Sequence, residues 1–206
     1  MRPFIHAIAG VALSCAMSLS AGAQEIVPER LKELNKNISD LTTKIDERSV
    51  AYPKVIKGIR DKTVKIEKAQ DEVDKLISDL NEITDQMDIK SDYRKELKAL
   101  EDKVNELIVK VEQTDDEALK DMLGLLKKRY EKIQKIDRDR AEAVIKARAA
   151  IRDLEDNQER LVLIIQIGHI DGAIAILEAS LQDFKDVVED ATAIAKAVDE
   201  EVIASP

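Results

Sequence analysis

The chain has 206 residues, 36% of them charged and 2% aromatic, and a formal net charge of −9 at pH 7. This profile is unlike that of a compact enzyme with a large mixed core and is close to that of long, periodic helices. The acidic balance and the scarcity of aromatic rings argue against nucleic-acid binding, which relies on basic surfaces and base stacking.

Residues 1–23 have the features of a cleaved secretory signal peptide. Arg2 gives the segment a positive start, residues 4–19 form an apolar run, and the small residues at 21–23 offer a cleavage site. The apolar run is shorter than the roughly 20 residues that a membrane-spanning helix needs, which argues against an uncleaved anchor. We therefore expect a periplasmic or secreted mature chain, residues 24–206, exported through a bacterial-type pathway.

The single cysteine, Cys15, lies inside this segment. The residues before it, Ala-Leu-Ser, depart from the pattern that precedes a lipid-modified cysteine in bacterial lipoproteins, so cleavage after Ala23 is the expected outcome. The mature chain would then hold no cysteine, and it could form neither a disulfide nor a thiolate metal site.

Apolar residues recur at a heptad spacing from Pro28 to about residue 88. Alternating steps of three and four residues predict a helix that packs knobs-into-holes along its length, and Pro28 suits the first turn of such a helix. Pro53 removes one helical hydrogen bond and Gly58 follows it. We therefore expect a kink or short break there, with the heptad frame resuming beyond it.

Two charged residues, Arg48 and Lys62, occupy apolar positions of this frame. One interpretation is that they set the register between helices, as single polar residues do in coiled coils. The other is that Pro53 distorts the helix and lets both side chains reach solvent. The sequence leaves both interpretations open.

The apolar frame shifts after Met87, which indicates either a stammer within one helix or a turn at residues 88–92. Ser91 or Asp92 could cap a helix that begins there. A second start signal is the capping box Thr-Asp-Asp-Glu at 114–117. This acidic cluster lacks the alternating ligands and the glycine of a calcium loop, so capping is favoured over calcium binding.

Thr114 is also the predicted main reversal of the chain. Residues 28–112 and 115–203 would form two arms of near-equal length that fold against each other. A further, weaker turn signal lies at 156–158 or at 168–172.

The second half of the chain is divided into blocks of opposite charge. Residues 127–152 contain ten Lys/Arg and four Asp/Glu, a balance of +6, and residues 178–206 contain two Lys and eight Asp/Glu, a balance of −6. Residues 54–68 carry a further +4, from six Lys/Arg and two Asp/Glu. We expect such blocks to pair across neighbouring helices.

A second apolar ladder runs from residue 163 to 202 and is broadest over 161–177. A broad apolar face is typical of a helix that contacts more than one neighbour. Gly168 and Gly172 predict a bend, a close backbone approach, or a break that Asp171 caps.

No catalytic, metal or cofactor motif emerges. His169 is the only histidine of the mature chain, and Asp171, two residues on, would not face it on a helix. The sequence lacks a Ser–His–acid grouping, a two-histidine metal motif and a glycine-rich phosphate loop. The triplet at 37–39 matches the glycan acceptor pattern, which matters only in a eukaryotic secretory pathway. We expect no enzymatic activity and no cofactor.

These observations predict an all-α protein, an elongated antiparallel helical bundle or coiled coil of long helices, with residues 24–206 as a single domain. The leading hypothesis for its function is an exported, non-enzymatic scaffold, adaptor or spacer that acts through helix–helix contacts. The broad apolar face at 161–177 needs covering, so we expect a homo-oligomer, most simply a dimer. The predicted interaction seam comprises Ile38, Ile45, Ile66, Leu80, Leu97, Leu107, Ile174 and Leu181.

Two alternative functions use the same apolar surfaces. Residues 161–177, with Asp171 as their one formally charged residue, could lie on a lipid surface. Against this, interfacial helices usually carry many basic residues on their polar face, and the C-terminal segment here is acidic. A holdase-type chaperone is the further alternative.

Overall fold

The computed structural model describes residues 27–114 and 117–204, apart from the side chain of Ala118. The predicted signal peptide and its cleavage site lie outside the described residues. Every regular element that the structure describes is helical, namely α2 (Glu29–Ser49), α3 (Tyr52–Arg60), α4 (Lys68–Met87), α5 (Asp92–Glu112), α6 (Glu117–Gln166), α7 (Ile170–Val198) and the π-helical turn η1 (Asp199–Ile203).

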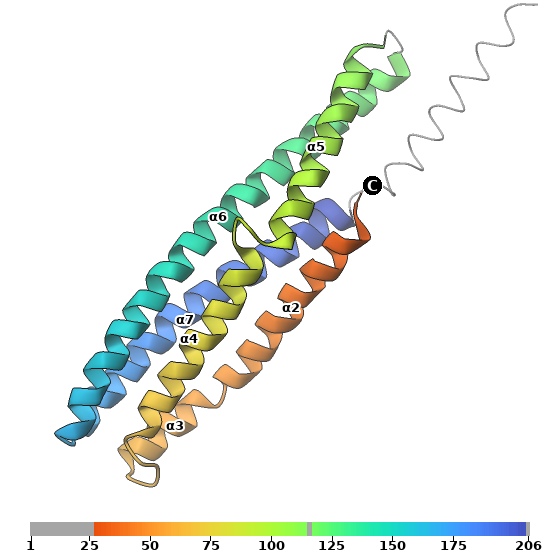
Figure 1. The fold of residues 1–206 in the computed structure, drawn as a ribbon. Helices are drawn as coiled ribbons and strands as arrows, with labels where there is room; N and C mark the ends of the chain where they lie inside the picture. The colour runs from red at the N-terminus through yellow and green to blue at the C-terminus, as the bar shows by residue number, and fades with distance from the viewer. Residues whose placement is uncertain (1–26, 115–116, 205–206) are drawn as a thin grey trace, which may run out of the picture.

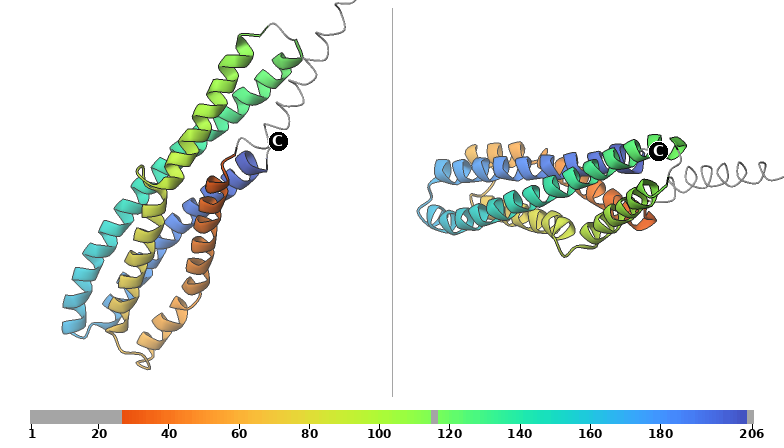
Figure 2. Two further views of the ribbon diagram at one scale, coloured as in Figure 1. Left: turned by 45° about the vertical axis from the view of Figure 1, so that its right-hand side comes forward. Right: turned by 90° about the horizontal axis from the view of Figure 1, so that it is seen from above.

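The helices form an elongated bundle of antiparallel segments (Figures 1 and 2). α2 and α3 run in one direction, α4 and α5 return, α6 reverses again, and α7 returns beside it. The longest helix, α6, packs against α4, α5 and α7. The prediction of an all-α, elongated antiparallel bundle is confirmed.

The core is a continuous layer of aliphatic side chains between the helices. Each helix contributes one apolar stripe, because residues three and four apart share a face. Leu80 of α4, Leu154 of α6 and Leu177 of α7 are all fully buried. Burial of one such leucine stabilises the fold by about 1.5–3 kcal/mol relative to leaving it exposed.

The chain reverses between α3 and α4, at residues 61–67, where the first heptad ladder was expected to continue. Pro53 lies in the first turn of α3, where its missing N–H needs no partner. The reversal itself follows Gly58, whose carbonyl accepts from the N–H groups of Thr63 and Val64. A Cβ on Gly58 would lie 2.5 Å from the Val64 side chain, so this close approach requires glycine. The predicted short break at Pro53 is confirmed, since α2 ends at Ser49 and α3 begins at Tyr52. The prediction that the first ladder then runs on to residue 88 in a single arm is wrong, because the chain reverses at 61–67.

The turn between α6 and α7 confirms the predicted break at residues 168–172 but corrects its cap. Gly168, at φ +69°, ends α6 in the left-handed conformation that favours glycine. His169, not Asp171, is the N-cap of α7, and its Nδ1 accepts from the Gly172 N–H at 2.9 Å. Asp171 already lies in the first turn, too late to reach that amide. Of the two alternative turn positions, 156–158 and 168–172, the structure has the second, since α6 continues through 156–158.

The segment around Thr114 joins α5 to α6 and reverses the chain. The Thr114 hydroxyl donates to the carbonyls of Lys110 and Val111, at 3.1 and 2.9 Å, and so closes the end of α5. Asp115 and Asp116 of the predicted capping box lie outside the described residues. Because the chain also reverses at 61–67 and 167–169, the prediction of two long arms joined at Thr114 is wrong; antiparallel segments of unequal length form instead.

Candidate functional site

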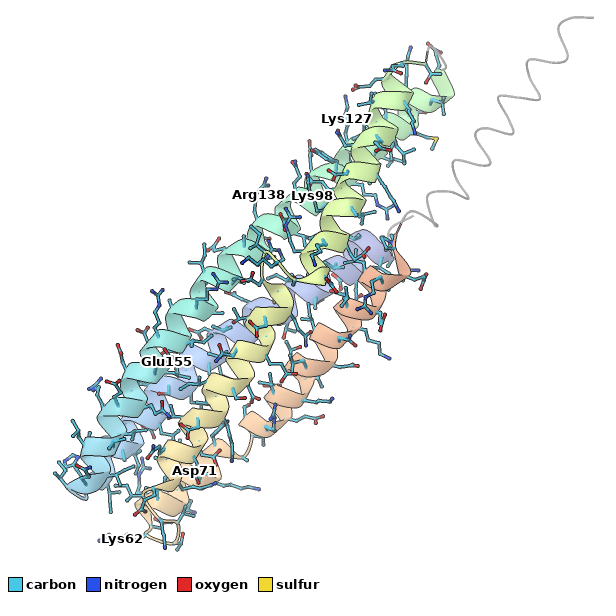
Figure 3. The ribbon with its side chains drawn as sticks, in the orientation of Figure 1. Lys62, Asp71, Lys98, Lys127, Arg138 and Glu155 are labelled. Atoms are coloured by element: carbon cyan, nitrogen blue, oxygen red, sulfur yellow. The ribbon has the colours of Figure 1, made fainter. Side chains whose placement is uncertain are left out.

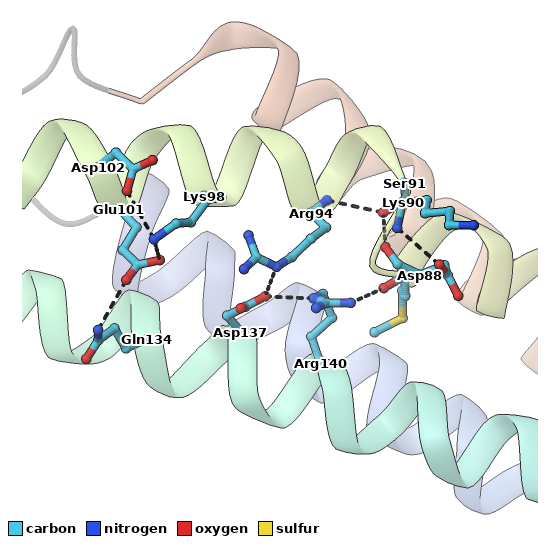
Figure 4. Close-up of polar contacts among 11 residues, drawn as sticks. Asp88, Lys90, Ser91, Arg94, Lys98, Glu101, Asp102, Gln134, Asp137 and Arg140 are labelled. Carbon is cyan, nitrogen blue, oxygen red and sulfur yellow. Dashed lines mark hydrogen bonds and ion pairs between the residues drawn. The ribbon is translucent and has the colours of Figure 1, made fainter.

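Polar and charged side chains gather at the break between α4 and α5 (Figure 4). α4 ends at Met87, and Ser91 caps α5 by accepting from the Arg94 N–H at 3.2 Å. This confirms both the predicted turn and Ser91 as its cap. The turn does not reverse the chain, since α5 continues in the direction of α4 (Figure 1).

Arginine side chains hold this break together from both sides. Arg140 of α6, only 2% exposed, donates to the carbonyl of Met87 and to Asp137 Oδ1, the latter at 2.9 Å. Arg94 of α5 contacts the same Asp137 oxygen at 2.8 Å, and Arg148 pairs with Asp88. The last carbonyls of a helix lack internal partners and favour a nearby cation. The cluster therefore joins α4, α5 and α6, with three arginines set against two aspartates and the Met87 carbonyl.

Glu101 of α5 forms a second interhelical polar contact. It is 8% exposed, accepts from Gln134 of α6 at 3.1 Å and pairs with Lys98 at 2.9 Å. Burial acts to raise the pKa of Glu101, but the hydrogen bonds from Lys98 and Gln134 outweigh it and hold the pKa below its ordinary value. A carboxylate held ionised in this way stabilises helix packing and is poorly suited to donate a proton.

A buried asparagine connects α2, α5 and the end of α7. Asn35, with no exposed surface, donates to the Ala195 carbonyl at 2.9 Å and to Asp199 Oδ1 at 2.8 Å. Its side-chain oxygen accepts from the Tyr93 hydroxyl at 3.0 Å. Burial raises the pKa of Tyr93 above its ordinary value, so the hydroxyl stays protonated as a donor. This network satisfies Asn35 from three segments and thereby fixes their register.

The two charged residues of the heptad frame, Arg48 and Lys62, lie in different kinds of structure. Arg48 donates to Asp79 of α4 at 2.8 Å, an interhelical contact that the register interpretation expects, and its side chain is also 55% exposed, as the solvent interpretation expects. Burial raises the pKa of Asp79 above its ordinary value, although the charge of Arg48 opposes this shift. Lys62 lies in the α3–α4 turn at φ 57°, so its assignment to a helical seam is wrong.

The predicted seam residues lie inside the bundle. Ile38, Ile45, Leu80, Leu97, Ile174 and Leu181 are buried, while Ile66 and Leu107 are partly buried against the core. The seam thus packs the chain against itself. The predicted pairing of charged blocks is confirmed by Lys146–Asp190 at 3.1 Å between α6 and α7, and by Lys132–Glu201 at 3.8 Å between α6 and η1.

The broad apolar face at 161–177 is divided by the α6–α7 turn. Leu161, Ile174 and Leu177 are buried, whereas Leu163 is 64% and Ile167 is 76% exposed. This stretch is not one helix, because α6 ends at Gln166 and α7 enters the core from the other side of the turn.

Surface grooves run between the helices. One of about 480 Å³ between α2 and α7 is lined by residues such as Ser39, Thr43 and Lys196, and one of about 330 Å³ lies between α6 and α7. Among the side chains that the structure describes, no three His, Cys, Asp or Glu residues gather in a metal-binding arrangement.

The α5–α6 hairpin extends past the rest of the bundle (Figures 1 and 2). Arg129 of α6 donates to the Val202 carbonyl of η1 at 2.8 Å, which marks where the last segment ends beside α6. We call residues 108–114 and 117–128 the projecting hairpin. Within it Val109 is 45% and Leu125 is 68% exposed. Sequence reasoning missed this feature, although the apolar run at 122–126 was a signal for it.

No known protein family, curated protein or solved structure matches this chain. None of the described helices combines the length and apolarity that crossing a bilayer requires.

Proposed function

We propose that the protein is a non-enzymatic helical scaffold, adaptor or spacer that contacts protein partners through helix–helix packing. The observation that carries the proposal is the projecting hairpin, a two-helix extension of the bundle (Figure 1). The interior polar groups described above are engaged in joining helices, which supports a structural role.

The physical argument rests on how many neighbours a helix needs. A two-helix hairpin buries one stripe of each helix, and apolar side chains outside that stripe stay in water. In the projecting hairpin Val109 and Leu125 are such side chains, with Leu119 and Leu123 partly buried beside them. A partner helix laid along the hairpin would cover them, and a second copy of the chain is the simplest partner.

The proposal includes export. It rests on the signal-peptide features of residues 1–23, which predict a mature chain that begins at residue 24. Intact-mass measurement of protein recovered from the periplasm or medium of an expressing bacterium tests it. Recovery of the uncleaved chain in the cytoplasm would contradict it.

Sedimentation equilibrium tests the hairpin as an association surface. We expect the mature wild type to form a homodimer at micromolar concentration and Leu125→Glu to be monomeric, because the new charge would be desolvated in the interface. Ile145→Glu is the matched control, since Ile145 lies on the same helix and is equally exposed at 68%. It should leave the association unchanged.

A monomeric wild type would contradict self-association, and equal effects of the two variants would contradict the hairpin as its site. Circular dichroism of each variant confirms that the helices are intact.

A further inference from the structure

The opposite end of the bundle from the projecting hairpin combines two features that lie far apart in the sequence. The α6–α7 turn and the α3–α4 turn both lie there (Figures 1 and 2). α3 packs against α7, and Arg60 reaches Glu178 at 3.5 Å. Figure 3 shows Lys62 at this end and Lys127 near the other. We call this region the lysine-rich end.

The α6–α7 turn supplies exposed apolar side chains. Val162, Leu163 and Ile167 are 39%, 64% and 76% exposed. The Ile167 N–H donates to the Leu163 carbonyl at 3.2 Å, so these two side chains share one face of the last helical turn. These apolar side chains lie outside the core, and their exposure to water is unfavourable.

Helix α3 and the α3–α4 turn supply positive charge at the same end. Lys54, Lys57, Lys62 and Lys65 are exposed, and no acidic side chain of the described residues lies within 4.0 Å of their ammonium groups. Residues 54–68 carry +4, and Arg160 with Glu159, Asp171 and Glu178 changes this to +2, in a chain of net charge −9. Residues 161–177 contain no Lys or Arg of their own, and α3 with the α3–α4 turn supplies basic side chains at the same end of the bundle.

We propose that the lysine-rich end binds the surface of an anionic phospholipid bilayer. Leu163 and Ile167 enter the boundary between headgroups and acyl chains, and the four lysines contact lipid phosphates. Apolar insertion combined with basic side chains is the pattern by which peripheral proteins recognise anionic membranes. Charge favours the lysine-rich end over the other end as the membrane contact. Residues 103–128 at the other end hold five Lys and six Asp/Glu, a balance of −1.

The protein contains no tryptophan, so a single introduced one reports its own surroundings. We expect the emission of Leu163→Trp to shift to the blue with vesicles of equal parts phosphatidylglycerol and phosphatidylcholine at low salt. Vesicles of phosphatidylcholine alone should give no shift. Leu125→Trp, which is comparably exposed in the projecting hairpin, is the matched control and should not respond to either vesicle.

Vesicle flotation of the otherwise unmodified mature chain gives the second measurement. Lysines near an anionic surface each strengthen binding roughly fivefold, so Lys62→Glu with Lys65→Glu should weaken partitioning at least about tenfold. Leu163→Asn with Ile167→Asn should also abolish flotation, whereas Lys110→Glu with Lys128→Glu at the other end should not reduce it. Binding should weaken as salt screens the lysines.

Three results would overturn the proposal. They are no flotation of the wild type with anionic vesicles at low salt, a blue shift at position 125 in place of 163, and a concentration-dependent shift at position 163 without vesicles. The last result would identify this end as a contact between copies of the chain. Circular dichroism of each variant shows whether its helices are intact, and so distinguishes these results from loss of the fold.

Discussion

At the scale of single residues, the interior of this bundle is specified by a few buried polar groups. Asn35, Arg140 and Glu101 each join helices that are distant in the sequence. An aliphatic seam alone tolerates sliding by a heptad, because leucine and isoleucine pack in many registers. A buried polar group has its partners in one register only, and leaving it unpaired is unfavourable.

The Asn35 network gives a residue-scale prediction. Asn35→Ala should lower the free energy of unfolding by about 2–3 kcal/mol, because it leaves the buried Tyr93 hydroxyl without its acceptor and removes the amide that donates to Asp199. Tyr93→Phe removes one hydroxyl and should cost about 1 kcal/mol. In urea unfolding the double variant should lose less than the sum of the two, because both remove the same hydrogen bond. Strict additivity would show that the contact contributes nothing.

At the scale of elements, glycines decide where helices end. Gly168 ends α6 at φ +69°, while Gly124 lies within α6, and an added Cβ would meet nothing within 4 Å at either position. Replacing either glycine by alanine should therefore change the stability of the protein only through the backbone. The two changes in stability should have opposite signs.

Gly168→Ala should destabilise the protein by about 1–2 kcal/mol, since alanine disfavours the left-handed conformation. Gly124→Ala should stabilise it by about 0.5–1 kcal/mol, because alanine is the better helix former. The urea midpoints should move to opposite sides of the wild type. A shift of both in the same direction would mean that the α6–α7 turn does not depend on Gly168.

At the scale of the whole molecule, stability should vary along the single helix α6. Its first turns belong to the projecting hairpin, whereas residues 147–154 pack against α4 and α7 in the bundle. Amides open more readily where fewer apolar contacts hold the helix.

Hydrogen exchange should show faster exchange at residues 119–127 than at 147–154. Both stretches belong to one helix, so intrinsic helix formation is held constant and the difference reports tertiary packing. Equal protection in the monomer would contradict the description of the hairpin as a separate, thinner part. If exchange in 119–127 slows as protein concentration rises, the hairpin is covered by a second copy.

The sequence by itself determined the class of structure and several of its breaks. Heptad spacing is a local property, and it correctly predicted long helices and an elongated antiparallel bundle. The frame shift after Met87 and the glycines at 168 and 172 correctly predicted two interruptions, because a cap or a positive φ depends on adjacent residues.

Only the tertiary structure decided which helices face one another. An apolar stripe needs a partner stripe, but its period is the same whether the helix continues or folds back, so the reversal at residues 61–67 was invisible in the pattern. For the same reason the sequence could not reveal that Arg140 reaches the end of α4 or that His169 caps α7. Exposed Leu163 lies at the same end of the bundle as the lysines of the α3–α4 turn, across about 100 residues, because antiparallel packing places alternate turns together.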